Sequence, residues 1–389
     1  MNTRNYLIAL TLCLGLQAAH AATIVVGTCQ RAQRTATTIS SAIAAARPGD
    51  VVAVCPGTYP EQLTITKPIS LEGIVIPNQP GATITPPPAG LLQLPANSSF
   101  YPQVYVNQAG APVTISNIGV SGTGANILFG SIVFDATSAC QIGFIKDFSG
   151  IYFQNTPGYL QNVSVTGHFV TSSGPGDPQP QQYPDCGSGI EFNNRHEVAI
   201  VTNSVINGFG FLGISSTGPL TANHNVLTTQ SGPYQVGIQA SAYSDIVGNS
   251  VSGAAFFTQT TGVQGGNLVQ DNVVQGFSLG IVNGGKVNHN ILLNNYTGIS
   301  DPNVATDNLI TSNMQQYVAP SCLGGACGPN PTYIPTIGID MQCEHSNQIR
   351  GNGFVGVGVG IANMKKNDTA SASNLYAQVG VNSTACTQK

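Results

Sequence analysis

The sequence predicts an all-β fold, a single-stranded parallel β-helix whose one chain winds through stacked coils, with a short N-terminal capping helix. Two markers repeat in phase along the chain and together indicate a solenoid. The first is Gly followed by Ile or Val, at Gly189, Gly213, Gly237, Gly262, Gly280, Gly298, Gly338 and Gly360. The second is Asn followed closely by Val, Leu or Ile, at Asn162, Asn203, Asn225, Asn249, Asn272, Asn290 and Asn308. The Gly markers are 18 to 25 residues apart except for one interval of 40, which we interpret as one coil plus an excursion.

Short runs of β-forming residues fill each repeat. Val, Ile and Leu cluster in runs bounded by Gly or Asn, with no helical periodicity between them, so these runs are predicted strands. A leucine-rich repeat of similar length would need a Leu skeleton that the chain lacks. Asn tolerates left-handed backbone, and its amide can bond to equivalents above and below, so we expect the repeated asparagines to be structural.

Composition limits the classes of partner. Only 7% of the residues are charged and 41% are hydrophobic, which is too apolar and too weakly charged for a disordered chain. The formal net charge of −4 leaves no basic surface for nucleic acid. No stretch after the N-terminus approaches the roughly 20 apolar residues that span a bilayer, so we expect no membrane insertion.

Residues 1–21 have the features of a cleavable signal peptide. Arg4 supplies the positive charge, Leu7 to Leu16 the apolar segment, and Ala19-His20-Ala21 a small-residue cleavage site, so the mature chain is expected to begin near Ala22. A lipoprotein is the alternative suggested by Cys13, but Leu12 stands where a lipobox needs a small residue. We therefore expect a secreted or periplasmic protein.

Eight cysteines remain after the leader, and an even number in an exported chain predicts disulfides. Short separations favour pairing Cys29 with Cys55 and Cys322 with Cys327; looser pairings are Cys140 with Cys186 and Cys343 with Cys386. A zinc site is the alternative for the close pair, but no second close Cys or His pair completes it.

The predicted organisation has four parts. They are a leader at 1–21, an N-terminal cap at 22–50 with a helix at 37–47, a parallel β-helix at 51–364, and a C-terminal cap or tail at 365–389. Breaks in the repeat predict insertions at 77–112, 171–187 and 315–335. Long loops in a compact solenoid often carry function.

The segment from Thr38 to Ile74 resembles the N-terminal cap and first coil of pectin-lyase-like right-handed β-helix proteins. The matching parts are the capping helix, Pro48-Gly49-Asp50, Pro56-Gly57-Thr58-Tyr59, Glu61 and Thr66-Lys67-Pro68. The resemblance implies a right-handed parallel β-helix. It does not imply one activity, because the superfamily includes pectate lyases, polygalacturonases, alginate lyases, epimerases, phage tailspikes and copper-linked NosD-like proteins. The catalytic motifs of these families are missing, and His and Met have no copper-ligand spacing.

Charge is concentrated at one place, which makes it the candidate site. Glu191, Arg195, His196 and Glu197 follow the insertion that carries Asp177, Tyr183 and Asp185, and His168 precedes it. Aligning the Gly markers stacks Glu191, Ser215, Gln239 and Gln264 in one outward column that could follow a sugar chain. Tyr183 and Tyr234 could add a stacking surface.

A catalytic interpretation assigns each of these groups a role. Glu191 or Asp185 would act as acid or base, His196 as the second proton carrier, and Arg195 would neutralise a uronate carboxylate. In the alternative interpretation Arg195 pairs with Glu197 on a solvated turn, and His168 and His196 are turn residues. We expect the charged residues beside the repeated asparagines to be structural: His224, His289, Asp245, Asp271 and Asp307.

Two functions remain in competition. One is an exported, monomeric β-helix that binds a polysaccharide or cell-surface glycan along a lateral face and cleaves or epimerises it. The other is a non-catalytic surface, adhesive or scaffolding solenoid. No cofactor or metal is expected, and a role for calcium has no supporting motif. Copper delivery is a third hypothesis.

Overall fold

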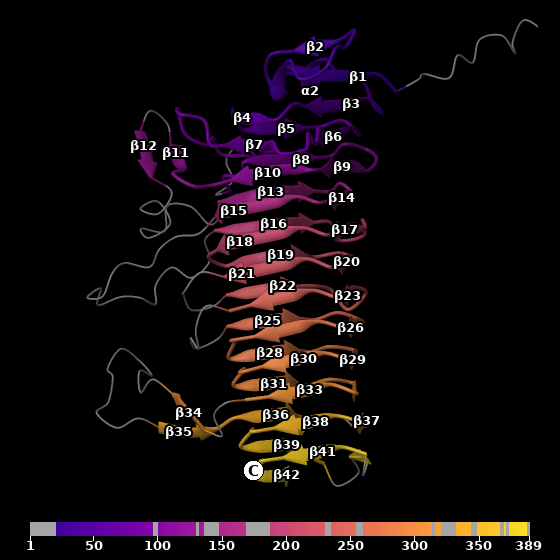
Figure 1. The fold of residues 1–389 in the computed structure, drawn as a ribbon, viewed down its shortest axis with the longest axis vertical. Helices are drawn as coiled ribbons and strands as arrows, with labels where there is room; N and C mark the ends of the chain where they lie inside the picture. Colours follow the sequence, from indigo (N-terminus) through magenta and orange to yellow (C-terminus); the bar gives the residue numbers. More distant parts are fainter. Residues whose placement is uncertain are drawn as a thin grey trace, which may run out of the picture.

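Strands are the dominant secondary structure of the described chain, which has a single helix. The structure is a computed structural model, and it describes residues 21–95, 100–129, 132–135, 148–168, 187–229, 235–253, 260–312, 316–319, 332–343, 348–365, 369–370 and 373–386. Three long sheets run the length of the molecule, and all neighbouring strands in them are parallel (Figure 1). The chain passes through sheets A, B and C in turn and then starts the next coil, so the predicted right-handed parallel β-helix is confirmed.

Sheet A has 14 strands and sheets B and C have 12 each. In sheet A these are β1 (Thr23–Val26), β2 (Thr35–Ala36), β3 (Val51–Val54), β6 (Ser70–Gly73), β9 (Val113–Ser116), β14 (Gly158–Gln161), β17 (Ala199–Thr202), β20 (Leu220–Asn223), β23 (Asp245–Val247), β26 (Leu268–Gln270), β29 (Lys286–Asn288), β32 (Val304–Thr306), β37 (Gln348–Arg350) and β40 (Thr369–Ala370). In sheet B they are β4 (Gly57–Pro60), β7 (Ala82–Thr85), β10 (Ile118–Ser121), β15 (Ser164–His168), β18 (Val205–Phe209), β21 (Val226–Thr229), β24 (Ser250–Ser252), β27 (Val273–Gln275), β30 (Ile291–Leu293), β33 (Leu309–Thr311), β38 (Gly353–Val355) and β41 (Leu375–Ala377). In sheet C they are β5 (Leu63–Ile65), β8 (Val104–Asn107), β13 (Ser149–Gln154), β16 (Ser188–Asn193), β19 (Leu212–Ser216), β22 (Val236–Gln239), β25 (Thr261–Gln264), β28 (Leu279–Val282), β31 (Thr297–Ser300), β36 (Ile337–Asp340), β39 (Val359–Met364) and β42 (Val381–Ala385).

The core is a set of vertical columns of aliphatic side chains inside the coils. Sheet C supplies Val104, Ile151, Ile190, Ile214, Ile238, Val263, Ile281, Ile299, Ile339 and Ile361, all buried and in one register. Burying each such side chain contributes about 1.5–3 kcal/mol before its entropy loss is counted. Ile299 pairs with Ile339, so the interval of 40 residues between Gly markers is one coil plus an excursion, as predicted.

The marker glycines lie where the wall of sheet C comes close to the core and to the next coil. A Cβ on Gly213 would lie 2.4 Å from the carbonyl oxygen of Gly237 and 2.8 Å from the side chain of Leu227. Neither the stacked backbone nor the packed core can yield at such distances, so this repeat position requires glycine.

Seven buried asparagines form a continuous ladder at the corner between sheets A and B. The members are Asn225, Asn249, Asn272, Asn290, Asn308, Asn352 and Asn374. Each side-chain oxygen accepts the backbone N–H of the residue one coil before it at 2.8–3.0 Å, which is Ser204 for Asn225 and an Asn for the other six. Each side-chain amide donates to a sheet A carbonyl at 2.8–3.2 Å. Side chains therefore supply acceptors for the buried N–H groups of this corner and an additional donor to the sheet A carbonyls.

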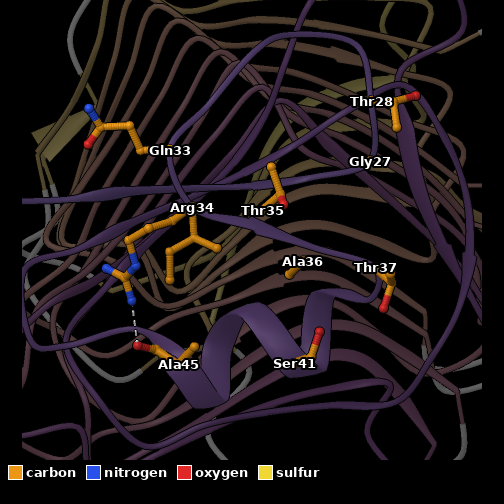
Figure 2. A pocket seen from close by; sticks show the side chains of 10 residues that line it. Gly27, Thr28, Gln33, Arg34, Thr35, Ala36, Thr37, Ser41 and Ala45 are labelled. Carbon is orange, nitrogen blue, oxygen red and sulfur yellow. Dashed lines mark hydrogen bonds between the residues drawn. The ribbon is translucent and has the colours of Figure 1, made fainter.

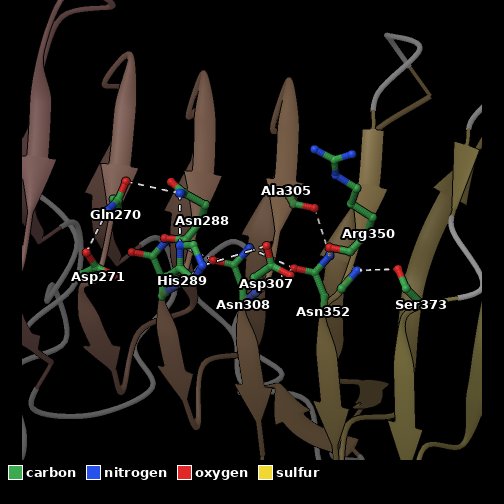
Figure 3. A network of polar contacts seen from close by, with 12 residues as sticks. Gln270, Asp271, Asn288, His289, Ala305, Asp307, Asn308, Arg350, Asn352 and Ser373 are labelled. Carbon is green, nitrogen blue, oxygen red and sulfur yellow. Dashed lines mark hydrogen bonds and ion pairs between the residues drawn. The ribbon is translucent and has the colours of Figure 1, made fainter.

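A second, exposed column runs beside the ladder and holds the left-handed backbone. Asn162 and Asn203 belong here, with φ of 53° and 51°, and not in the buried ladder in which they were expected. The other non-glycine members of this column include His224, Asp271, His289 and Asp307. Figure 3 shows the two columns side by side. In the exposed column, Nε2 of His289 is 4.0 Å from Oδ2 of Asp307. His224, Asp271, His289 and Asp307 all adopt the left-handed backbone of this column, which supports the structural role expected for them.

The N-terminal end of the solenoid is covered by helix α2 (Ile39–Ala45), slightly shorter than the expected 37–47 because Thr38 is the N-cap. Two residues of the segment that resembles pectin-lyase-like proteins, Glu61 and Lys67, bind the two ends of this helix. Glu61 accepts the backbone N–H groups of Ile39 and Ser40, both at 2.8 Å. Lys67 donates to the carbonyls of Ala44 and Ala46 at 3.0 and 2.6 Å. Both charges complement the helix dipole.

Two expected boundaries differ in the structure. Strands β7 and β8 lie within the expected insertion 77–112 but pair with neighbouring coils in sheets B and C, so the excursion is only the connection between them. Strands β40 to β42 continue all three sheets through the expected tail 365–389, so the solenoid extends to Ala385. The sequence missed both points because Gln103 in the first of these coils and Asn382 in the last stand where the sheet C strands from β13 to β39 have glycine.

Two excursions begin as antiparallel hairpins. Strands β11 (Asn126–Phe129) and β12 (Ile132–Asp135) pair between β10 and β13, where no insertion was expected. Strands β34 (Gln316–Ala319) and β35 (Thr332–Pro335) pair within the expected insertion 315–335. Most of the expected insertion 171–187 lies outside the described residues.

Disulfides join Cys29 to Cys55 beside the cap and Cys343 to Cys386 at the last coil, as expected. The other four cysteines, Cys140, Cys186, Cys322 and Cys327, lie outside the described residues.

The ladder predicts a position-specific loss of stability. Replacing Asn272 with Ala removes the acceptor for the N–H of Asn249 and the donor to the carbonyl of Ile246. The buried N–H and side-chain amide of Asn249 then lose their acceptor, and the Ile246 carbonyl loses one donor, so we expect the free energy of unfolding to fall by about 2–4 kcal/mol. Urea unfolding followed by circular dichroism measures this.

The matched control is Asn203→Gly in the exposed left-handed column, where glycine adopts the same backbone without strain. We expect a change within about 0.5 kcal/mol. Equal losses in the two variants would contradict the distinction between the columns.

Candidate functional site

The outer surface of sheet C carries the polar column expected from the sequence. Glu191, Ser215, Gln239 and Gln264 occupy equivalent positions on four successive strands. Each is half-buried and follows an inward Ile or Val, so the side chains point away from the core. The predicted alignment of these four residues is confirmed.

Hydrogen bonds between successive coils order the polar side chains of this column. The Ser215 hydroxyl donates to the Gln239 side-chain oxygen at 3.2 Å, and the Gln239 amide donates to the Gln264 oxygen at 3.4 Å. A chain of this kind aligns donors and acceptors at the spacing of the strands, about 4.8 Å. Sugar hydroxyls are both donors and acceptors, so such a surface can bind them along several coils.

Two tyrosines that the sequence analysis missed continue the column above Glu191. Tyr152 pairs with Glu191, and Tyr105 pairs with Tyr152. The two rings are stacked with centroids 6.0 Å apart, and Phe100 stacks on Tyr152 at 5.5 Å. Both tyrosines are almost completely buried, so they support the upper end of the column and are not an open stacking surface. Gly150-Ile151, an overlooked marker, would have revealed Tyr152.

Polar residues beside the tyrosines hold their hydroxyl groups in place. Asn193 donates its amide to the Tyr152 hydroxyl at 3.3 Å, and the Tyr105 hydroxyl donates to the side chain of Gln154. Burial raises the pKa of Tyr105, and the neighbouring Tyr152 adds to this effect. Tyr105 therefore stays a neutral hydrogen-bonding group.

The column continues below Gln264 through Val282 and Ser300 to Asp340. Asp340 accepts the N–H of Gln342 at 3.0 Å and the amide of Asn363 at 2.8 Å. Six strand spacings separate Glu191 from Asp340, about 29 Å. Glycosidase carboxylates lie about 5–10 Å apart, so Glu191 and Asp340 do not form a catalytic pair.

The structure separates the other predicted catalytic residues. Arg195 and His196 are exposed on the turn from β16 to β17, after the chain has left sheet C. In the described part of the chain, no ion pair joins Arg195 to Glu197. Asp185, Tyr183 and Tyr234 lie outside the described residues.

The four longest connections each join a strand of sheet B to the next strand of sheet C. They join β7 to β8, β10 to β13, β15 to β16, and β33 to β36.

His168, expected on a turn, instead lies in the core at the end of β15. Its Nε2 is 3.2 Å from the side-chain oxygen of Gln103, which occupies the position that Gly150 takes one coil later. The Phe148 ring packs against it, with ring centroids 5.1 Å apart. Burial lowers the pKa of His168 to about 3, so the ring stays neutral at physiological pH.

The described residues contain no cluster of three or more His, Cys, Asp or Glu side chains that could hold a metal ion. Within the same residues, no helix has the length and hydropathy that a membrane span requires.

The class that these sheets define is the right-handed parallel β-helix. This chain carries a polar column on the outer face of sheet C. Protein-family models and curated proteins yield no match to the chain. Among solved structures, it is similar to GH136 lacto-N-biosidase from Eubacterium ramulus, with 10% identity and a TM-score of 0.40 over 79% of this chain and 66% of that one. Pectin methylesterase PemA from Erwinia chrysanthemi has 13% identity and a TM-score of 0.36, over 91% and 92% of the two chains. Identities this low concern the fold alone, which the strand pairings already establish.

Buried His168 predicts a specific acid sensitivity. Its pKa is lower in the folded state than in the unfolded state, so the unfolded chain binds a proton that the native chain does not between about pH 6.5 and 3. Stability should fall as the pH drops through this range, by about 1.4 kcal/mol per pH unit. Urea unfolding at pH 7.0, 5.5 and 4.5 measures the slope.

The comparison protein is His168→Gln, which keeps a polar partner for Gln103 but cannot titrate. Carboxylates titrate alike in both proteins, so the difference between their slopes isolates His168. Identical pH profiles would show that His168 is not held neutral by burial.

Proposed function

We propose that this chain is an exported β-helix that binds a polysaccharide along the outer face of sheet C. The observation that supports it most is the column from Glu191 to Gln264, in which consecutive coils present side chains in register. A linear polymer is the ligand that matches a linear array of hydrogen-bonding groups. Because the tyrosines above Glu191 are buried, we expect the binding surface to begin at the Glu191 coil.

Charge on this surface favours a neutral glycan over a polyuronate. The column from Thr64 to Ala362 contains two carboxylates, Glu191 and Asp340, and no Lys or Arg. A uronate polymer would bring its own negative charges against them without compensation. Arg195, previously assigned to a uronate, is on the turn beyond the strand.

Export is part of the same proposal. The leader at 1–21 supports it, and so do the two disulfides, because disulfides persist in oxidising compartments. Any cleavage of the glycan would need Glu191 together with a second acid from the excursion before β16, for which Asp185 is the candidate.

Binding should depend on the amide column. Truncating Gln239 to Ala removes its bonds to Ser215 and Gln264, and we expect roughly fivefold weaker binding. Glu191→Gln should weaken binding about tenfold and abolish any turnover. Calorimetry against a mixed-linkage β-glucan, a galactomannan, a xylan and polygalacturonate measures affinity, while reducing ends and unsaturated-uronate absorbance, with and without calcium, report turnover.

The matched control is Asp245→Asn, an exposed carboxylate on the outer face of sheet A. It should leave binding unchanged. Unchanged affinity in both sheet C variants would reject this surface as the site, and no binding by the folded wild type to any of the four polymers would reject the neutral-glycan proposal.

A scaffolding function is the second candidate, and the outer face of sheet B favours it. One column there carries exposed aliphatic side chains: Val205, Val226, Ile291, Leu309 and Leu375. Such a surface is typical of contact with another macromolecule. If two chains associate through it, Leu309→Gln should lower the mass found by sedimentation equilibrium; a wild type that stays monomeric at high concentration would oppose self-assembly.

A further inference from the structure

The first coil contains a buried carboxylate beside the expected end of the leader. Asp50 is 3% exposed and follows the capping helix. It accepts the N–H of Arg47 at 2.9 Å and the Arg34 guanidinium at 3.0 Å. Its remaining oxygen accepts the backbone nitrogen of Ala22 at 2.9 Å. The hydrogen bond from Arg47, with those from Ala22 and Arg34, holds the pKa of Asp50 below its usual value.

Ala22 also bonds to the first coil through its carbonyl. This carbonyl accepts the N–H of Val51, and the pairing of β1 with β3 starts at the next residue, Thr23. Ala21 is exposed. The bond that the Ala19-His20-Ala21 motif marks for cleavage therefore lies directly before a residue that is fixed to the solenoid.

We propose that cleavage between Ala21 and Ala22 completes the N-terminal cap, because the α-ammonium group that it creates forms an ion pair with buried Asp50. Hydrolysis consumes one water molecule: the peptide bond breaks, Ala21 keeps the new carboxylate, and Ala22 gains the ammonium group. The Ala22 nitrogen is 2.9 Å from the carboxylate oxygen before cleavage, so no rearrangement is needed. A neutral amide donor is replaced by a charged one, which makes a stronger hydrogen bond.

Arg34 alone does not give Asp50 a complete set of charged partners. Its guanidinium also donates to the carbonyl of Ala45 at 2.8 Å (Figure 2). Both residues line a hollow of about 880 Å³ between the β1–β2 segment and helix α2. Among the described residues, the only ion pair of Asp50 is with Arg34. Nearby Lys67 binds the carbonyls of Ala44 and Ala46, and Arg47 contributes its backbone N–H to Asp50. The new ammonium would thus be the second cation on this carboxylate.

The first test compares two N-termini of the same protein: one begins at Ala22, and the other keeps Ala19 to Ala21 so that Ala22 stays an amide. At pH 7 and low salt, calorimetry should show a melting temperature about 1–4 °C higher for the Ala22 form. The ammonium group stabilises the fold while it is protonated, so the difference should disappear as the pH rises to about 10. Asp50→Asn should remove it at all pH values.

A second measurement does not depend on how well Asp50→Asn folds. Reductive ¹³C-methylation labels the α-amine while keeping its charge, and NMR then follows its titration. In the Ala22 form this amine should titrate about one pH unit higher than in the extended form. Equal melting temperatures with equal titrations would overturn the ion pair, and so would an exported protein whose N-terminus, by mass spectrometry, is not Ala22.

This inference rests on the export that we propose but not on glycan binding. A protein that shows the N-terminal ion pair and binds none of the four polymers would keep the first and lose the second.

Discussion

Vertical register between coils is the constraint on which the rest of this molecule depends. Each residue lies directly above its equivalent, so any property required at one position is required again one coil later. The Asn ladder shows the consequence: the side chain of Asn272 satisfies a backbone N–H of the coil before it and relies on Asn290 for its own. Gly213 shows the steric side, because the next coil's carbonyl occupies the space that a side chain would need. Both devices stabilise the stack while using almost no charge.

The same register makes a lateral surface that behaves as an array. Ser215, Gln239 and Gln264 are separated by 24 and 25 positions in the sequence, yet their side chains form hydrogen bonds with one another. Side chains ordered in this way lose little further conformational entropy when a ligand binds. We propose a neutral polymer as the ligand because this column contains no Lys or Arg. Because Glu191 and Asp340 are too far apart to act as a catalytic pair, we propose binding and not cleavage as the function of this surface.

The two ends of the solenoid are stabilised by different means. At the N-terminus, Glu61 and Lys67 hold the capping helix, and Asp50 joins the first strand to the end of that helix. At the C-terminus, Ser383 takes the position that Ile361 occupies in the core column, and the Cys343–Cys386 disulfide ties down the last coil. A polar residue at this core position reduces the apolar surface that the open end of the core would expose.

The sequence by itself determined the fold, the coil period and the alignment of Glu191 with Gln264, because a solenoid repeats the same local requirements and a repeat is visible in one dimension. It also located the two disulfides and the structural charges beside the asparagines. Only the tertiary structure separated the buried ladder from the left-handed column, since both use asparagine. It alone placed His168 in the core, Tyr152 above Glu191 and Arg195 beyond the strand, because these depend on which face a residue presents and on which coil lies next to it. The contact between Ala22 and Asp50 joins residues 28 positions apart, and no local pattern reports such a pairing.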